Sequence, residues 1–493
     1  MGIEIDRAQF DQEDRRRFVQ RLEVQLEQLR EMLRRPGFGT RADTIGAELE
    51  LYIIDRDGRP AYINEALHEA ANDPLLTVEL NRYNLEYNLA PEHLAHEGLL
   101  ATERSIVANL ERLSTLADEQ GCRIVPIGIL PTLRHEDFGD HCVTDRQRYR
   151  ALVAQLIEWR GNDFQIDING ADPLQIAMAD ITLEGANTSF QVHQRVAPDD
   201  YAAMFNAVQL VTPLALAIGA NSPGLFGHRL WDETRVPLFK QSIDTRHMDR
   251  YRWSEPARVS FGHGWVRQGP LELFDQTVRL YPPLLPVCGA EQQMPPLGLA
   301  PELAELRLHQ STVWLWNRPI YDDADGGHLR IEMRSLPAGP SAIDMIAGAA
   351  LMMGLARGLR DRMEDLLPAL PFPLAEYNFY RAAQYGLSAR LVWPSERQHG
   401  LREGAVTDII SELLPVADSG LDALGVSREE RDRYLGVIDA RLAVRRNGAD
   451  WQRDCAQRLE EAGRSKQAAL EQMLERYVQL SQSNEPVAGW PLP

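Results

Sequence analysis

The chain has 493 residues, which is long enough for two or three domains. Its hydrophobic content of 44% and charged content of 25% are typical of a globular protein in water. The net charge of −20 argues against nucleic acid as a partner, because binding to a phosphate backbone needs a basic surface.

Two other features of the whole chain argue against a membrane partner and against a disulfide framework. The most apolar stretches, residues 210–220 and 346–356, are too short for a membrane span of about 20 residues. The four cysteines lie far apart and form no CxxC pair, so neither disulfides nor a zinc cluster are expected. We therefore expect a cytoplasmic protein whose partners are small molecules, and the sequence leaves homo-oligomerisation open.

Hydrophobic periodicity predicts mixed helices and strands over the first three quarters of the chain. Helices are predicted at residues 12–34, 97–119, 200–218 and 341–361, and strands at 44–55, 122–130, 163–170, 178–184 and 188–196. After about residue 373 the chain is predicted to be nearly all helix, with residues 451–482 as its longest helical stretch. The pattern predicts an α+β body over residues 1–373 and a mainly helical region, 374–493, packed on it.

The first predicted strand carries two carboxylates on one face. Alternate residues from Ile45 to Ile53 are apolar, whereas Glu48 and Glu50 lie together on the opposite face. Neighbouring carboxylates repel each other unless a cation lies between them, so this face either meets water or binds metal.

A second pair of carboxylates follows at Glu79 and Glu86. Glu86 lies on the polar face of an alternating segment, and Glu79 lies seven residues earlier. The turn-forming residues Asn81 and Asn84 allow a chain reversal between the two glutamates. Such a reversal would bring both carboxylates to one site.

Two later segments show the same alternation. Their polar faces consist of Gln191, His193 and Arg195 in one segment and Arg330, Glu332 and Arg334 in the other. For one segment alone a solvated face is the commoner explanation, and a lone histidine is more often structural than a ligand. The four segments together favour a site for divalent ions and nucleotide phosphates. Because the sequence has no GxxxxGK[ST] loop, phosphate binding is expected to fall to arginines and metals.

The ordered set of segments resembles the glutamate–cysteine ligase 2 and carboxylate–amine ligase family of the glutamine synthetase superfamily. Residues 46–50, Gly-Ala-Glu-Leu-Glu, resemble the family's Gly-x-Glu-x-Glu start, and residues 221–223 are similar to its Asn-Ser-Pro loop. Residues 332–334 are similar to its Glu-x-Arg strand. Gln191 departs from the pattern, because the family typically has His-x-His where this chain has Gln-Val-His. The resemblance extends over roughly residues 40–365.

The resemblance implies a glutamine synthetase-like antiparallel sheet that forms a funnel, flanked by helices, with ATP and Mg²⁺ (or Mn²⁺) at its waist. It implies metal ligation by six residues: Glu48, Glu50, Glu79, Glu86, His193 and Glu332. Catalytic roles are assigned to Glu50 and to Arg334, which would contact the transferred phosphoryl group. Contacts with the cofactor are assigned to Arg330, Arg235 and Asn221, although loop capping and surface charge explain Arg235 and Asn221 equally well.

The function implied by the resemblance is that of an ATP-dependent carbon–nitrogen ligase. ATP would phosphorylate a substrate carboxylate, and an amine would attack the acyl phosphate to form an amide; glutamate and cysteine are the expected pair. The alternatives are a ligase for another amino acid or peptide, a related phosphotransferase, and a non-catalytic nucleotide-binding scaffold.

Overall fold

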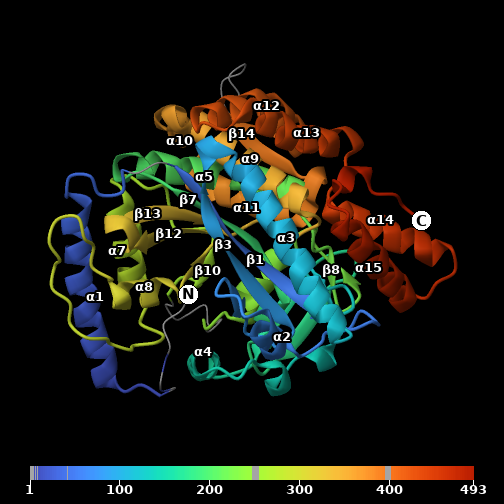
Figure 1. Ribbon diagram of the computed structural model, residues 1–493, viewed down its shortest axis with the longest axis horizontal. Helices are drawn as coiled ribbons and strands as arrows, with labels where there is room; N and C mark the ends of the chain where they lie inside the picture. Colours follow the sequence, from blue (N-terminus) through green and yellow to red (C-terminus); the bar gives the residue numbers. More distant parts are fainter. Residues whose placement is uncertain (1–4, 6, 8, 41–42, 247–254, 395–400) are drawn as a thin grey trace.

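The computed structural model describes residues 5, 7, 9–40, 43–246, 255–394 and 401–493. The largest sheet among these residues has seven strands in the order β12-β13-β7-β1-β3-β2, with β4 also paired to β1 (Figure 1). Every pair in this sheet is antiparallel. Its strands are β1 (Thr44–Ile54), β2 (Leu76–Val78), β3 (Asn84–His93), β4 (Arg123–Val125), β7 (Phe190–Arg195), β12 (Asn317–Asp322) and β13 (His328–Met333).

Helices flank the sheet, so the predicted α+β class with an antiparallel sheet is confirmed. The helices of the body are α1 (Gln12–Leu33), α2 (Asn64–Ala71), α3 (Gly98–Glu119), α4 (Gln147–Arg160), α5 (Tyr201–Gly219), α6 (Arg235–Ser242), α7 (Pro270–Leu280), α8 (Ala304–Gln310) and α9 (Ala342–Leu359). The apolar face of the sheet packs on α3 and α9, and α9 packs on α5. This arrangement leaves the opposite, polar face of the sheet free to line a site.

The apolar stretches at 210–220 and 346–356 lie at the helices predicted for 200–218 and 341–361, and the apolar helical segments of the structure are longer than these two stretches. The helical segments Pro198–Gly219 and Ala342–Ala369 are each long and apolar enough to cross a membrane, but 89% of the most apolar window in each is buried inside the protein. Burial in the core therefore explains their composition.

Shorter two-stranded sheets complete the body and the C-terminal region. The pairs are β5 (Phe164–Ile168) with β6 (Leu174–Met178), β8 (Gly224–Leu225) with β9 (His228–Arg229), β10 (Val259–Ser260) with β11 (Trp314–Leu315), and β14 (Arg390–Pro394) with β15 (Leu401–Ala405).

The strand predicted at residues 178–184 is wrong. β6 ends at Met178, and a 3₁₀ helix covers Thr182–Ala186. The reason is local, because the carboxylate of Asp180 accepts hydrogen bonds from the Thr182 amide (2.8 Å) and hydroxyl (2.5 Å). Such side-chain bonds to nearby backbone favour a turn over an extended strand.

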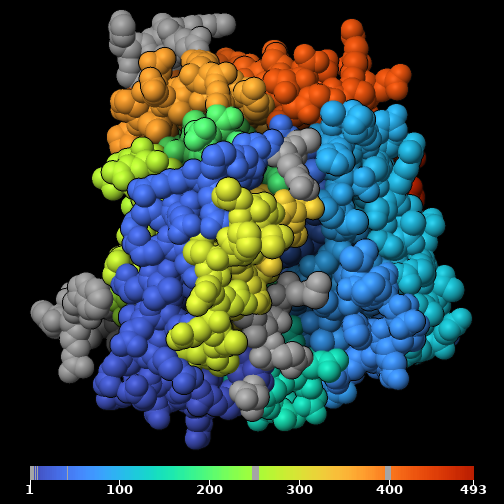
Figure 2. Space-filling view, turned by 60° about the vertical axis from the view of Figure 1, so that its left-hand side comes forward, coloured from blue at the N-terminus to red at the C-terminus, as the bar shows by residue number. Residues whose placement is uncertain are grey.

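The N-terminal helix α1 packs on α7 and α8, at the edge of the molecule opposite α14 and α15 (Figure 1). Residues 289–299 run alongside it, yellow beside blue in Figure 2. Backbone carbonyls of this segment accept hydrogen bonds from α1: Ala290 from Arg21 (2.7 Å) and Gln292 from Gln28 (3.0 Å). The first helix is thus fastened to a segment more than 250 residues further along the chain.

Beyond α9 the described part of the chain is mainly helical, apart from the β14–β15 hairpin. Its helices are α10 (Met363–Ala369), α11 (Phe372–Tyr385), α12 (Val406–Ala423), α13 (Arg428–Val444), α14 (Gly448–Glu461) and α15 (Lys466–Gln482). The single long helix expected at 451–482 is wrong: Gly463 adopts a φ of +92°, which ends α14, and the side chain of Ser465 caps α15.

These C-terminal helices pack closely on the body. α12 and α13 lie against α9, and one hydrophobic core includes residues from both parts. Arg441 of α13 forms a buried ion pair with Asp344 of α9 (2.6 Å), and it donates to the Ile218 carbonyl of α5 (2.9 Å). The proposed boundary at residue 373 falls inside α11, so the division at this position stays a prediction.

Replacing Arg441 tests how firmly the C-terminal helices are held. The side chains of Arg441 and Asp344 are 1% and 0% exposed, so Arg441→Met leaves a carboxylate buried without its partner. We expect the free energy of unfolding to fall by about 3–5 kcal/mol in denaturant titrations. The exposed pair Arg428–Asp432 on the same helix provides the control, and Arg428→Met should leave the unfolding midpoint unchanged. Equal midpoints for both variants would show that the buried pair holds the helices no more firmly than the exposed one.

Candidate active site

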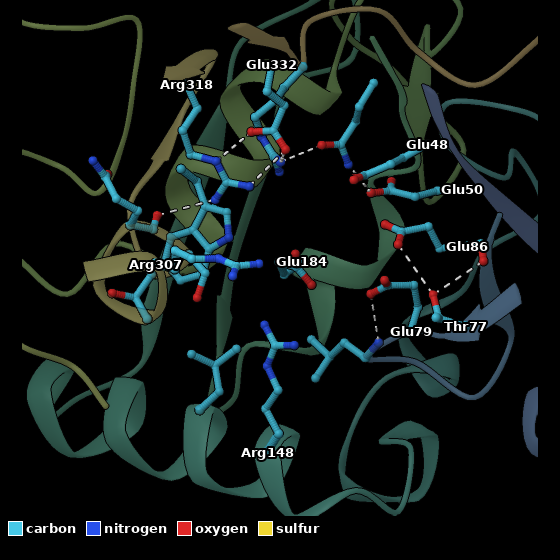
Figure 3. A pocket seen from close by; sticks show the side chains of 18 of the residues that line it. Glu48, Glu50, Thr77, Glu79, Glu86, Arg148, Glu184, Arg307, Arg318 and Glu332 are labelled. Carbon is cyan, nitrogen blue, oxygen red and sulfur yellow. Dashed lines mark hydrogen bonds and ion pairs between the residues drawn. The ribbon is translucent and has the colours of Figure 1, made fainter. Parts of the chain in front are cut away.

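The polar face of the main sheet lines a cavity of about 460 Å³. Six carboxylates line this cavity, from Glu48, Glu50, Glu79, Glu86, Glu184 and Glu332, and Figure 3 shows their side chains around an open space. All six predicted metal ligands, with Arg334 and Arg330, lie among its lining residues. The structure therefore brings together side chains that are separated by nearly 290 positions in the sequence.

Strand register explains how the sheet gathers these residues. Glu50 on β1 lies opposite Glu86 on β3, and Glu332 on β13 lies opposite His193 on β7. Antiparallel pairing places such partners side by side on one face. Glu79 joins them because β2 and β3 pair as a hairpin, with the chain reversal that the sequence predicted between Glu79 and Glu86.

One group of ligand atoms surrounds His193. Its Nε2 atom lies 3.2 Å from Glu48 and 3.8 Å from Glu332, and its buried Nδ1 atom has no hydrogen-bond partner among the described residues. One ligand atom from each of these three residues can be chosen so that all lie within 4.8 Å of one another. Glu332 also forms a two-pronged ion pair with Arg318, through Nε (2.5 Å) and Nη2 (2.9 Å).

Arginine charge already compensates part of this first group. Burial raises the pKa of Glu332, but the charges of Arg318 and Arg334 outweigh it and hold this pKa far below its usual range. Burial likewise raises the pKa of Glu48, and the nearby imidazole of His193 brings it to a net lowering. Both carboxylates are therefore charged at neutral pH.

A second group consists of Glu50, Glu79, Glu86 and Glu184. None of these four makes an ion pair within the part of the chain that the structure describes. Burial raises the pKa of Glu86 to about 8, with further repulsion from Glu48 and Glu50. Burial and repulsion by Glu50 raise the pKa of Glu184 to about 7, and the pKa of Glu79 also lies well above its usual range. Without a cation, the carboxyl groups of Glu79, Glu86 and Glu184 therefore tend to keep their protons near neutral pH.

The residues of both groups fit divalent metal ions. Carboxylate oxygens with at most one imidazole are the ligand set that suits Mg²⁺ or Mn²⁺. The Nε2 atom of His193, which also has no hydrogen-bond partner among the described residues, and the raised pKa values of the second group are features that a bound cation would relieve. The first group can hold one cation and the second another, and β1 carries a member of each, Glu48 and Glu50.

Arginines line the cavity across from the second group. Arg318, Arg330 and Arg307 are engaged with Glu332, Asp322 and Asp323. Arg148, near the start of α4, points into the cavity in Figure 3 and has no ion-pair partner among the described residues. Its guanidinium is therefore available to an anionic ligand.

Sequence reasoning missed four of these cavity residues: Glu184, Arg148, Arg307 and Arg318. The sequence signal for Arg318 is weak, because β12 alternates in burial but not in hydrophobicity: Ile320 shares the face of Arg318, and Asn317 lies on the buried face. Glu184 was hidden by the wrong strand prediction at 178–184. Arg148 and Arg307 lie on helices, and only tertiary packing turns them toward the cavity.

Two predicted cofactor-binding residues, Asn221 and Arg235, are absent from the cavity lining. Asn221 is fully buried and bonds to the Ala338 carbonyl and the Tyr477 hydroxyl (both 2.8 Å). Arg235 is 2% exposed and forms an ion pair with Glu233 (2.6 Å). Because neither side chain can meet a ligand in the cavity without breaking these contacts, the prediction for both is corrected.

The raised pKa values predict how metal-free protein responds to pH. Folded Glu86 and Glu184 hold their protons more tightly than the unfolded chain, where a glutamate titrates near pH 4.3. The stability of the folded state should therefore fall as pH rises from about 5 to 8. We expect the melting temperature in EDTA to drop over this range and Mg²⁺ to restore it most at pH 8. Glu86→Gln should flatten the pH dependence, whereas Glu92→Gln on the same strand should not.

Comparison with known proteins places the chain in a family. A sequence profile of glutamate-cysteine ligase family 2 matches residues 44–475. Two relatives, from Frankia casuarinae and Frankia alni, carry the name "Putative glutamate–cysteine ligase 2-1". The first is 35% identical over 138 residues (26% of this chain and 31% of the relative), and the second is 25% identical over 324 residues (63% and 65%).

A solved structure shares the fold. The crystal structure of glutamate–cysteine ligase from Francisella tularensis in complex with AMP superposes with a TM-score of 0.51. The alignment covers 92% of this chain and 91% of that one, at 12% identity. At this identity the likeness concerns the fold alone, whereas the profile covers most of the chain. The chain belongs to glutamate-cysteine ligase family 2.

Proposed function

We propose that this chain is an ATP- and Mg²⁺-dependent carboxylate–amine ligase that forms an amide through an acyl phosphate. The observation that carries the proposal is the cavity, in which carboxylates without ion-pair partners face arginines. A nucleotide triphosphate with divalent cations has the charge pattern that complements such a site. Family membership and the AMP in the related Francisella structure support the nucleotide.

The chemistry follows in two steps. The γ-phosphoryl group of ATP is transferred to a substrate carboxylate, which gives ADP and an acyl phosphate. An amine then attacks the acyl carbon, loses a proton and expels phosphate. The most specific form of the proposal is synthesis of γ-glutamylcysteine from glutamate and cysteine, which the names of the Frankia relatives support.

The chain's own residues position and neutralise the reacting groups. Glu48, His193 and Glu332 would hold one cation, and Glu50, Glu79, Glu86 and Glu184 a second. Bound Mg²⁺ would neutralise phosphate charge. Arg334 contacts Gln191 and Glu332 beside these groups, so its guanidinium can stabilise charge on the transferred phosphoryl group.

The cavity also has an apolar side, formed by Leu152, Ile243, Phe274, Leu285 and Trp314. A surface of this kind suits the flat base of a nucleotide, because it buries apolar area without requiring many polar partners. We place the protein in the cytoplasm, where ATP is available; the burial of its two apolar helices supports this location.

Phosphate release from ATP tests the proposed reaction. Purified protein with Mg²⁺, L-glutamate and a panel of amines should release phosphate only when a carboxylate and an amine are both present, and mass spectrometry should find the amide. Glu50→Gln should lower the rate at least about 100-fold, because it removes one charge from the cation site. Glu92→Gln is the matched control. Turnover with glutamate and a different amine would keep the ligase and remove cysteine, whereas binding of ATP without turnover would favour a non-catalytic role.

Arg148 should bind an anionic group of a substrate. We expect Arg148→Gln to raise the KM of one substrate about tenfold or more, as for loss of a charged hydrogen bond, with little change in kcat. Arg150→Gln two residues along α4 is the control, because Arg150 pairs with Asp145 on the surface. A higher KM for ATP would assign Arg148 to phosphate, and a higher KM for glutamate to the amino-acid carboxylate. Unchanged KM values for every substrate would contradict the assignment.

A further inference from the structure

A buried ion pair lies behind Arg334, outside the cavity. Arg235 Nε donates to Glu233 Oε1 (2.6 Å), and these side chains are 2% and 0% exposed. The Glu233 carboxylate also accepts hydrogen bonds from the backbone amide of Asn221 (2.9 Å) and from the side-chain hydroxyl of Ser222 (2.5 Å). All three of these donors come from one loop, residues 221–235, which contains the short β8–β9 hairpin.

The same arginine reaches the segment after β13 that carries the active-site arginine, Arg334. Its Nη2 donates to the carbonyl of Ser335 (2.7 Å), the residue directly after Arg334. The Arg334 amide donates to the Trp316 carbonyl (2.9 Å), and the Leu336 carbonyl accepts from Phe190 (2.9 Å). The backbone is thus held by hydrogen bonds at Arg334, Ser335 and Leu336, and Arg235 donates the one at Ser335.

The loop itself is held by the C-terminal helices. Asn221 donates to the hydroxyl of Tyr477 on α15 (2.8 Å) and accepts from Gln452 of α14 (2.8 Å). The start of α14 leaves no room around it, because a Cβ atom on Gly448 would lie 2.1 Å from Asn221 Oδ1. Helices α14 and α15 therefore fix Asn221 at the start of the loop, and the backbone amide of Asn221 bonds to Glu233 near its end.

We propose that Glu233 and Arg235 are positioning residues that fix Arg334 for catalysis, and that Asn221 connects them to α14 and α15. The C-terminal helices then serve the reaction without contacting its substrates. The inference rests on the proposed function for the role of Arg334. It also explains why Asn221 and Arg235 are buried in hydrogen bonds rather than exposed to the cavity.

Arg235→Lys tests this relay, by which we mean the series of hydrogen bonds that runs from α14 and α15 through Asn221, Glu233 and Arg235 to the Ser335 carbonyl. Lysine keeps the charge, but its single nitrogen cannot bond to both Glu233 and Ser335 in the geometry of the arginine. We expect kcat to fall about 10- to 100-fold through misplacement of Arg334, while KM for ATP and for the amino acids changes less than about threefold. Arg229→Lys, in the same loop but paired with Asp172 on the surface, should leave both constants unchanged.

A milder variant covers the case in which Arg235→Lys does not fold. Tyr477→Phe removes only the hydroxyl, which accepts from Asn221 and donates to the Pro126 carbonyl (2.9 Å), and kcat should fall about 3- to 10-fold at constant KM. Unchanged kcat in the folded variants would overturn the proposal. A raised KM at constant kcat would also overturn it, because that result would indicate substrate binding rather than positioning.

Hydrogen exchange separates this inference from the proposed function. If the wild type ligates no substrate pair, the proposed function fails, and the relay is judged on backbone protection alone. Peptides that contain residues 333–337 should exchange faster in Arg235→Lys than in wild type or Arg229→Lys, because the central bond to Ser335 is weakened. Equal exchange in all three proteins would overturn the relay whatever reaction the protein catalyses.

Discussion

Mutual repulsion among carboxylates on one face of a sheet is the constraint on which this structure depends. Antiparallel pairing puts Glu50 beside Glu86, the β2–β3 hairpin adds Glu79, and the 3₁₀ helix at Thr182–Ala186 adds Glu184 to the same cavity. Charged groups held this close in a partly dry space favour protonation or a cation. The rest of the fold keeps them together: the opposite face of the sheet is buried on α3 and α9, so the strands cannot move apart.

The positive charges around the cavity are nearly all arginines, whose planar guanidinium groups can donate two directed hydrogen bonds at once. The fork of Arg318 matches both oxygens of Glu332, and the fork of Arg235 joins a carboxylate to a backbone carbonyl. A lysine ammonium offers a point charge and could not make either pair of directed bonds. Arginines therefore fix geometry at the site as well as balancing charge.

Much of the site could be predicted from the sequence, because it depends on alternation along strands. Glu48, Glu50, His193 and Glu332 lie on the polar faces that the period of two indicates, and turn formers correctly suggested the reversal between Glu79 and Glu86. The roles of these residues in metal binding and catalysis stay predictions. The antiparallel α+β fold and the family are confirmed.

What the sequence could not supply depends on long-range packing. Arg148 and Glu184 reach the cavity from a helix and a turn whose positions no local pattern fixes. Asn221 lies in the segment that resembles the family's Asn-Ser-Pro loop, and Arg235 follows it, yet tertiary contacts bury both. The sequence predicted one helix where the structure has α14 and α15. The helical periodicity is nearly continuous there, but Gly463 ends α14 and Ser465 caps α15.

The alternation of β1 between core and cavity has a consequence for how such proteins diverge. Sliding this strand by one residue would exchange Glu48 and Glu50 for leucine and alanine on the polar face and bury charge in the core. The spacing of the ligands is therefore fixed once the sheet has formed, whereas single substitutions at polar positions leave the core untouched. New substrate preferences are expected to arise in the helices and turns that complete the cavity, because substitutions there do not alter the pairing of the strands.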